Sequence, residues 1–377
     1  ESMDDAGRRR TARRQILKVL LCVLLALVLA ALAYVAYVFL SWYRVEDNQP
    51  LEVDWPDVDC VTASVEREEG LRVVSYNIGF GAYSDDYSFF MDGGKESRAR
   101  SPQAVQENVG GAMGAAMGLR PDFLLLQEVD VDGTRSCHVD QLALVREAWE
   151  AASGRPAFST FAQNYDSPYL LWPLLEPHGA NRAGLAVLSA HCINSALRRQ
   201  LPIEEGLMKL VDLDRCYSVQ RIPLAFGEEK ELVLYNLHLS AYTSDGTIAE
   251  EQLKMLFADM LEEYEKGNCA VAGGDFNKDL LGNSSEIFGV SGPAYTWAQP
   301  IPPELIPEGL GIVAPLDAEN PVPSCRNADR PYGPENYVVT VDGFIVSDNV
   351  EVLGSGVLDT GFRWSDHNPV YLDFLLK

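Results

Sequence analysis

The chain has 377 residues, of which 47% are hydrophobic and 23% charged, so it can hold one large domain or two ordinary ones with a sizeable core. The net charge is −25, but residues 1–44 carry +4, which leaves −29 for the rest of the chain. Affinity for a phosphate backbone needs clustered Lys and Arg, so this acidity disfavours a nucleic-acid partner. A bound metal ion would still allow a small phosphoester to bind.

A membrane-spanning helix is predicted over residues 19–40, which are apolar throughout. Such a helix is about 33 Å long, and Trp42 and Tyr43 follow where an interfacial aromatic belt would lie. The basic residues 1–18 precede it, so the positive-inside rule places the N-terminus in the cytoplasm and the rest of the chain outside. The alternative is a cleaved signal peptide, whose apolar core is shorter, about 7–15 residues.

After a Pro-containing acidic stretch that reads as a linker, short apolar runs alternate with a few helices. Strands are expected over residues 71–76, 122–126, 184–188, 218–225, 231–237, 269–272, 338–346 and 368–376. Helices are expected over residues 102–118, 140–152 and 247–264. Aromatic-lined loops are expected over 79–94 and 164–178, and irregular structure over the Pro- and Gly-rich stretch 282–335. This mixture favours mixed sheets over a strictly parallel α/β fold.

The seven cysteines include no Cys-x-x-Cys pair, which argues against a zinc ribbon or a thioredoxin-type motif. A disulfide is permitted in a domain outside the cytoplasm. We expect Cys192 and Cys216 as the pair, because both are placed on neighbouring predicted strands.

Polar residues that suit metal and phosphate chemistry stand in or near the ends of the predicted strands. They are Asn77, Glu128, His238, Asp275, Asn277, Asp342, Asp366 and His367. Each one alone has an ordinary explanation, such as a turn cap, a surface charge or a core histidine. Because strand ends at one sheet edge meet in space, the set as a whole predicts a functional site.

These residues lie in six ordered motifs, through which the chain from Leu71 onward resembles the endonuclease/exonuclease/phosphatase superfamily of metal-dependent phosphoesterases. The motifs are Val74–Asn77, Leu126–Val129, Asn236–Leu239, Gly274–Asn277, Val341–Phe344 and Ser365–Val370. The resemblance implies an α+β fold: a four-layer α/β/β/α sandwich of two mixed β-sheets, here preceded by one N-terminal transmembrane helix.

The resemblance also implies roles for single residues. Glu128 would be the principal Mg²⁺ ligand, assisted by Asn77 and Asp366, with Mn²⁺ as a substitute ion. Asp275 and Asn277 would orient the attacking water and hold the phosphoryl group, and His238 would stabilise the transition state. His367, oriented by Asp342, would be either the general base or a donor to the phosphate. Arg182 and His138 are further candidates for substrate binding, against the simpler explanation that they are surface residues.

We therefore expect a single-pass protein with a cytoplasmic tail (1–18), a membrane helix (19–40), a linker (41–70) and an extracytoplasmic catalytic domain (71–377). Its expected activity is Mg²⁺-dependent hydrolysis of a phosphodiester or phosphomonoester. Three alternatives stay open. They are an extracellular nuclease on DNA or RNA, a sphingomyelinase-like lipid phosphodiesterase and a non-catalytic binding module. The aromatic loops and the anchor would suit the lipid enzyme.

Overall fold

A computed structural model describes residues 2–57, 60, 63–66, 70–204, 206–210, 212–225, 229–241, 247–290 and 297–377. These residues form two units, one ending at Tyr43 and the other running from Arg44 to Lys377. The first unit is built on one helix, α1 (Ser2–Ser41). Its residues 10–41 are long and apolar enough, by length and composition, to cross a membrane.

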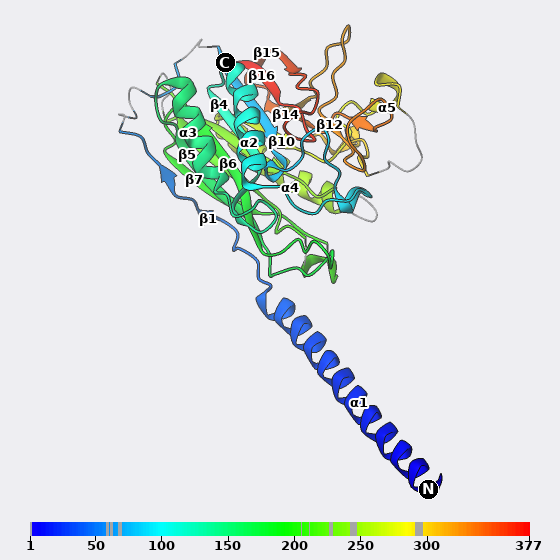
Figure 1. The fold of residues 1–377 in the computed structure, drawn as a ribbon. Helices are drawn as coiled ribbons and strands as arrows, with labels where there is room; N and C mark the ends of the chain where they lie inside the picture. Colours follow the sequence, from blue (N-terminus) through cyan, green and yellow to red (C-terminus); the bar gives the residue numbers. More distant parts are fainter. Residues whose placement is uncertain are drawn as a thin grey trace. The chain divides into compact units, whose positions relative to one another are not determined.

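The second unit contains two seven-stranded sheets (Figure 1). The first sheet runs in the spatial order β1 (Gln49–Pro50), β7 (Ser195–Gln200), β8 (Cys216–Pro223), β9 (Glu231–His238), β10 (Cys269–Asp275), β14 (Asp342–Ser347) and β11 (Leu310–Val313). The second runs β15 (Val350–Val357), β16 (Val370–Leu376), β3 (Leu71–Asn77), β4 (Phe123–Gly133), β6 (Asn181–Ser189), β5 (Phe158–Asp166) and β2 (Val53–Asp54). Both are mixed, because β9 and β10 run parallel, as do β3 and β4, within otherwise antiparallel sheets.

Helices cover the outer faces of the two sheets. Those near the second sheet are α2 (Pro102–Gly118) and α3 (Gln141–Ser153), while α4 (Thr247–Glu265) covers the first sheet. The remaining short elements are α5 (Ser284–Ile287), η1 (Gly79–Gly81), η2 (Phe90–Asp92), η3 (Met208–Leu210), η4 (Pro303–Leu305) and the pair β12 (Cys325–Arg326) and β13 (Val338–Val339).

The alternation of side chains along each strand divides the core into layers. On β3, Val73 points into the cluster between the two sheets, whereas Val74 points to the cluster under α2 and α3. On β9, Leu234 faces the inter-sheet cluster and Tyr235 faces the cluster under α4. The result confirms the expected α+β sandwich of two mixed sheets between helices.

Several elements were not expected from the sequence. Strands β5, β7, β11 and β15 were missed, and β7 and β15 are only partly buried, so their sequences lack the continuous apolar run of a central strand. The stretch 41–70, which was expected to be a linker, contributes two strands to the folded unit. Its strands β1 and β2 extend the two sheets, and Arg44 forms an ion pair with Asp214 at 2.6 Å.

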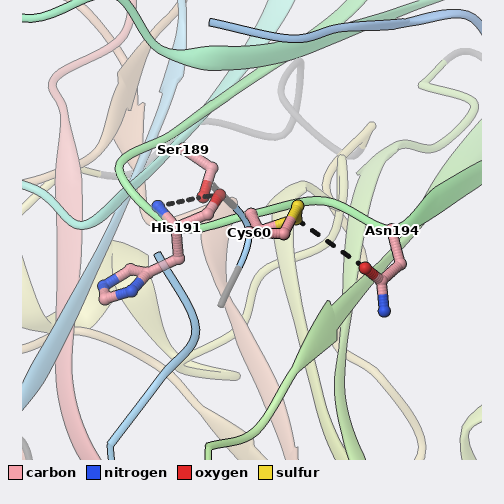
Figure 2. Close-up of a disulfide and its surroundings, with 5 residues drawn as sticks. Cys60, Ser189, His191 and Asn194 are labelled. Carbon is pink, nitrogen blue, oxygen red and sulfur yellow. Dashed lines mark hydrogen bonds between the residues drawn. A yellow bond between two sulfur atoms is a disulfide. The ribbon is translucent and has the colours of Figure 1, made fainter. Parts of the chain in front are cut away.

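The expected Cys192–Cys216 disulfide is wrong. Cys192 is bonded to Cys60, and Figure 2 shows this disulfide beside the Ser189–His191 turn and Asn194. Strands β7 and β8 pair so that Cys216 lies opposite Gln200, at the far end of the hairpin from Cys192. Cys216 is buried and free.

Candidate active site

The polar strand-end residues meet at one end of the two sheets because the strand registers align them. Asp275, the last residue of β10, lies opposite His238 on β9 and opposite Asp342 on β14. Asn77 ends β3 on the facing sheet, beside Gln127 of β4. The register therefore brings His238, Asp275 and Asp342 together at the end of one sheet and places Asn77 at the end of a strand in the other.

Local backbone geometry sets the direction of two of these side chains. Glu128 lies within β4, at a register shift between Leu126 and Val129, and has φ of 55°. Such a bulge re-aims a side chain that regular strand geometry would point elsewhere. Asn277 has φ of 49°, and Gly274 precedes it with φ of 153° and no room for a Cβ against Leu237. Left-handed backbone at non-glycine residues concentrates at functional sites.

The carboxylate of Asp275 is the centre of the cluster. Its Oδ2 accepts a hydrogen bond from Asn77 Nδ2 at 3.1 Å and lies 3.5 Å from His238 Nε2 and 3.7 Å from His367 Nε2. Its Oδ1 accepts a hydrogen bond from the backbone N–H of Asn277 at 2.9 Å. One buried carboxylate thus joins side chains from both sheets.

Asn77 links this centre to Glu128. Its Nδ2 also donates to Glu128 Oε1 at 3.3 Å, while its Oδ1 accepts from the N–H of Gly79 at 3.0 Å. In this orientation Asn77 turns its nitrogen, and not the oxygen that a cation would bind, toward Glu128. In this orientation Asn77 holds the two carboxylates together, and its role as a metal ligand stays a prediction.

His367 and Asp342 form the expected pair. His367 Nδ1 lies 2.8 Å from Asp342 Oδ2, which also accepts from the Ser324 hydroxyl at 2.7 Å. The other ring nitrogen of His367 faces Asp275 and the Cys325 thiol, whose sulfur lies 3.6 Å away. Asp342 thereby fixes the ring orientation and leaves Nε2 directed into the cluster.

Burial and neighbouring charges shift the pKa values of the three central groups in different directions. Burial raises the pKa of Asp275 to about 7, although His367 acts to lower it. Burial alone would lower the pKa of His367, but Asp342, Cys325 and Asp275 together raise it well above its ordinary value. Burial and nearby cations lower the pKa of His238 well below its ordinary value. Near neutral pH the cluster therefore pairs a cationic His367 with a neutral His238 and a carboxylate that is close to its titration point.

The site is rich in carboxylates, and their donor atoms suit a hard divalent cation. Asp275, Asp342 and His367 place ligand atoms within 4.8 Å of one another. Two of these three, Asp342 and His367, are joined by a hydrogen bond, and Glu128 stays the predicted principal ligand. Burial raises the pKa of Glu128; the cation of Arg135 opposes this shift, and the negative charge of Asp366 adds to it. A divalent ion would balance the same charge.

The expected binding residues Arg182 and His138 lie outside this buried cluster. Arg182 is exposed on β6, and His138 is exposed and pairs with Asp132 at 2.7 Å. Arg135 is instead buried and ion-paired with Asp130 at 2.7 Å, with its guanidinium over the ring of Phe80.

Ser324 is a site residue that the sequence did not reveal. Its hydroxyl oxygen accepts from the N–H groups of Val341 and Asp342 and donates to the Asp342 carboxylate. It lies in a Pro-containing stretch without periodicity, so only the fold brings it to Asp342.

Comparisons with known proteins agree with the family resemblance and with the fold. A family model described as Endonuclease/Exonuclease/phosphatase family matches residues 74–367. No curated protein matches the sequence.

Three similar solved structures cover most of the chain. The endonuclease/exonuclease/phosphatase from Beutenbergia cavernae has 18% identity and a TM-score of 0.52, over 82% of this chain and 72% of that one. ANGEL2, described as a 2',3'-cyclic phosphatase, has 16% identity and a TM-score of 0.52, over 86% and 98%. The protein from Bacteroides vulgatus has 15% identity and a TM-score of 0.50, over 82% and 100%. At these identities the likeness concerns the fold.

Proposed function

Because the chain belongs to the Endonuclease/Exonuclease/phosphatase family, whose members hydrolyse phosphoester bonds, we propose that it is a membrane-anchored phosphoesterase whose water attack is centred on Asp275. The observation that carries this proposal is the convergence of Asn77, His238 and His367 on one carboxylate oxygen of Asp275. A general base is most effective when its pKa lies near the working pH, and the pKa of Asp275 is raised to about 7.

The neighbouring side chains divide the remaining tasks. Asp275 accepts the proton of the attacking water, and Asn77 and Asn277 hold its two oxygens in place. His367, kept cationic by Asp342, donates a hydrogen bond to a phosphoryl oxygen and offsets its growing charge. His238, kept neutral, offers a hydrogen bond without adding charge.

We assign Glu128 and Asp366 as the residues that hold a divalent ion, with Mg²⁺ as the ion and Mn²⁺ as its substitute. Mg²⁺ binds through few protein oxygens and keeps several waters, which leaves room for a substrate phosphate. When bound, such an ion polarises the phosphoryl oxygen and neutralises developing charge. Asn77 then acts through Glu128, which it holds.

Helix α1 supports the anchoring part of the proposal. We place residues 1–18 in the cytoplasm, residues 19–40 in the bilayer and the folded unit outside, because the basic residues precede the apolar run. The Cys60–Cys192 disulfide supports an oxidising compartment. Arg182 and His138, both exposed, are kept as candidates for contacts with the substrate beyond the phosphate.

Hydrolysis by the full chain in detergent tests the proposal. The panel is a chromogenic phosphodiester, plasmid DNA, RNA, a nucleotide set and vesicles of sphingomyelin or phosphatidylinositol, each with and without Mg²⁺. His367→Ala and Glu128→Gln should abolish hydrolysis of the preferred substrate, while Glu351→Gln, at an exposed acid on β15, should retain it. The absence of hydrolysis of every substrate, together with no Mg²⁺-induced rise in melting temperature, would point instead to a binding module.

A further inference from the structure

One exposed loop of the folded unit combines apolar composition with unusual exposure. The sequence of residues 169–175 is Tyr-Leu-Leu-Trp-Pro-Leu-Leu, which contains no charged residue. Within it, Trp172, Leu174 and Leu175 are 66%, 71% and 102% exposed. Single exposed apolar residues are ordinary, but a contiguous exposed group marks an interaction surface. We call residues 169–175 the apolar loop.

Backbone hydrogen bonds hold the base of the apolar loop, so its tip stays exposed to solvent and does not fold back onto the core. Leu170 and Gly179 exchange two backbone hydrogen bonds, each of 3.0 Å. The N–H of His178 donates to the carbonyl of Trp172 at 3.1 Å. Beyond the tip, the Glu176 carboxylate accepts from the N–H of Ser97 at 2.8 Å.

The base of the loop also adjoins the candidate active site. The His178 ring lies 6.4 Å from the ring of Phe80 and 6.2 Å from that of Phe89, between ring centroids. Phe80 belongs to η1, which follows Asn77 after one residue. A surface that engages the apolar loop therefore lies beside the catalytic end of the sheets.

The chain itself indicates the occupant. Helix α1 ends at Ser41, and Arg44 and Val45 are already bound to Asp214 of the folded unit, by bonds of 2.6 Å and 2.9 Å. Two residues separate the anchor from the domain, which is a reach of about 10 Å at roughly 3.5 Å per residue. With α1 in a bilayer, as in the proposed function, the folded unit is held permanently at the membrane surface.

We propose that the apolar loop is a second membrane contact, in which Trp172, Leu174 and Leu175 enter the interface of the bilayer that holds α1. Trp is favoured at the headgroup level and Leu just below it. The net charge of −29 outside residues 1–44 disfavours anionic lipid, so the contact is with a zwitterionic surface. This contact would present the active site to phosphoesters at the lipid–water interface. It rests on the anchoring part of the proposed function and not on hydrolysis.

The test uses the full chain, reconstituted in phosphatidylcholine vesicles that contain a doxyl-labelled quenching lipid. An environment-sensitive fluorophore is attached to one introduced cysteine, in a background with Cys22→Ala and Cys137→Ser, which removes the thiols that are not buried. Leu175→Cys reports on the apolar loop. Leu353→Cys is the matched control, because Leu353 is also an exposed leucine but lies on β15. Val28→Cys, in α1, reports on the anchor.

We expect strong quenching and a blue-shifted emission at positions 28 and 175, and neither effect at position 353. If the fluorophore is quenched at position 28 but is quenched at neither position 175 nor position 353, the second contact is overturned and the membrane anchor is retained. Equal quenching at 175 and 353 also overturns it, since the contact would not be specific to the loop. A blue shift at 175 without lipid quenching overturns it in favour of a protein partner. The absence of quenching at 28 overturns the anchoring and the inference together, and the hydrolysis assay remains independent of all four results.

Discussion

Two buried polar clusters in the folded unit are built on opposite principles. Arg198 is fully buried, and its guanidinium donates to the carbonyls of Gln163, Val45 and Asp214 and to the Asp214 carboxylate, at 2.8–3.2 Å. In the cluster around Asp275, by contrast, His238 Nδ1 and Asp342 Oδ1 are buried without a hydrogen-bond partner among the described residues.

The difference separates structural from functional use of buried charge. In the Arg198 cluster, the buried guanidinium is hydrogen-bonded to carbonyls and to a carboxylate, as buried polar groups in a stable core are. The Asp275 cluster collects acids, shifts the pKa values of Asp275, His238 and His367, and leaves capacity for further partners. We therefore expect substitutions in the first cluster to reduce stability and those in the second to reduce activity.

The largest effect is expected from Asp275→Asn. The amide cannot take a proton from water, so the rate of hydrolysis should fall by about 10² to 10⁴-fold, the range for removal of a general base. Steady-state kinetics on the preferred substrate measures this loss, and circular dichroism confirms that the fold is kept. A variant within tenfold of the wild-type rate would show that another group accepts the proton.

Arg198→Leu should reduce the stability of the fold and leave the rate of hydrolysis largely unchanged. It removes the donor to the carbonyls of Gln163, Val45 and Asp214, while Arg44 still pairs with the Asp214 carboxylate, so we expect a loss of about 2–4 kcal/mol of unfolding free energy. Arg100→Ala is the matched control, because its ion pair with Asp86 is exposed and should be worth only about 0–1 kcal/mol. Chemical denaturation of both variants measures the difference, and equal losses would contradict the distinction between the clusters.

The stability of the metal-free protein should depend on pH through the active site. Asp275 has a raised folded pKa of about 7, so its contribution to stability is present at pH below 4 and is lost as pH rises from about 4 to 7. His367, whose pKa is also raised, contributes stability below about pH 6.5 that is lost at higher pH. At about 1.4 kcal/mol per pKa unit, Asp275 accounts for a few kcal/mol.

Thermal unfolding in chelator, followed from pH 4 to pH 8, checks this dependence. Asp275→Asn should lose less stability than the wild type over this range, because its side chain does not ionise. The same slope in both proteins would show that Asp275 does not titrate in this window.

The smallest effect is expected from Ser324→Ala. It removes the acceptor of two buried N–H groups and a donor to Asp342, which should cost about 1–3 kcal/mol of stability and reduce activity less than Asp275→Asn does. Ser324→Thr keeps the hydroxyl and should restore both properties. Failure of Thr to restore activity while stability returns would show that the hydroxyl does not act through Asp342.

The sequence by itself predicted the central strands, and the resemblance carried by its motifs implied the layered fold. Apolar runs such as 71–76 and 231–237 predicted central strands because both faces of such strands are buried. The polar residues near the ends of such runs, including Asp275 and His367, were predicted to converge because strands of one sheet end at a common edge.

Only the tertiary structure decided what depends on pairing between distant segments. Strands β7 and β15 are half-polar and become strands only through their neighbours. The register of β7 against β8 separates Cys216 from Cys192, and the fold brings Cys60 to Cys192 across 132 residues. The hydrogen bond from Gly79 turns the nitrogen of Asn77 toward Glu128, and the burial that moves the pKa of Asp275 exists only once both sheets have packed. Local pattern predicts elements, whereas register, orientation and burial are properties of the assembled chain.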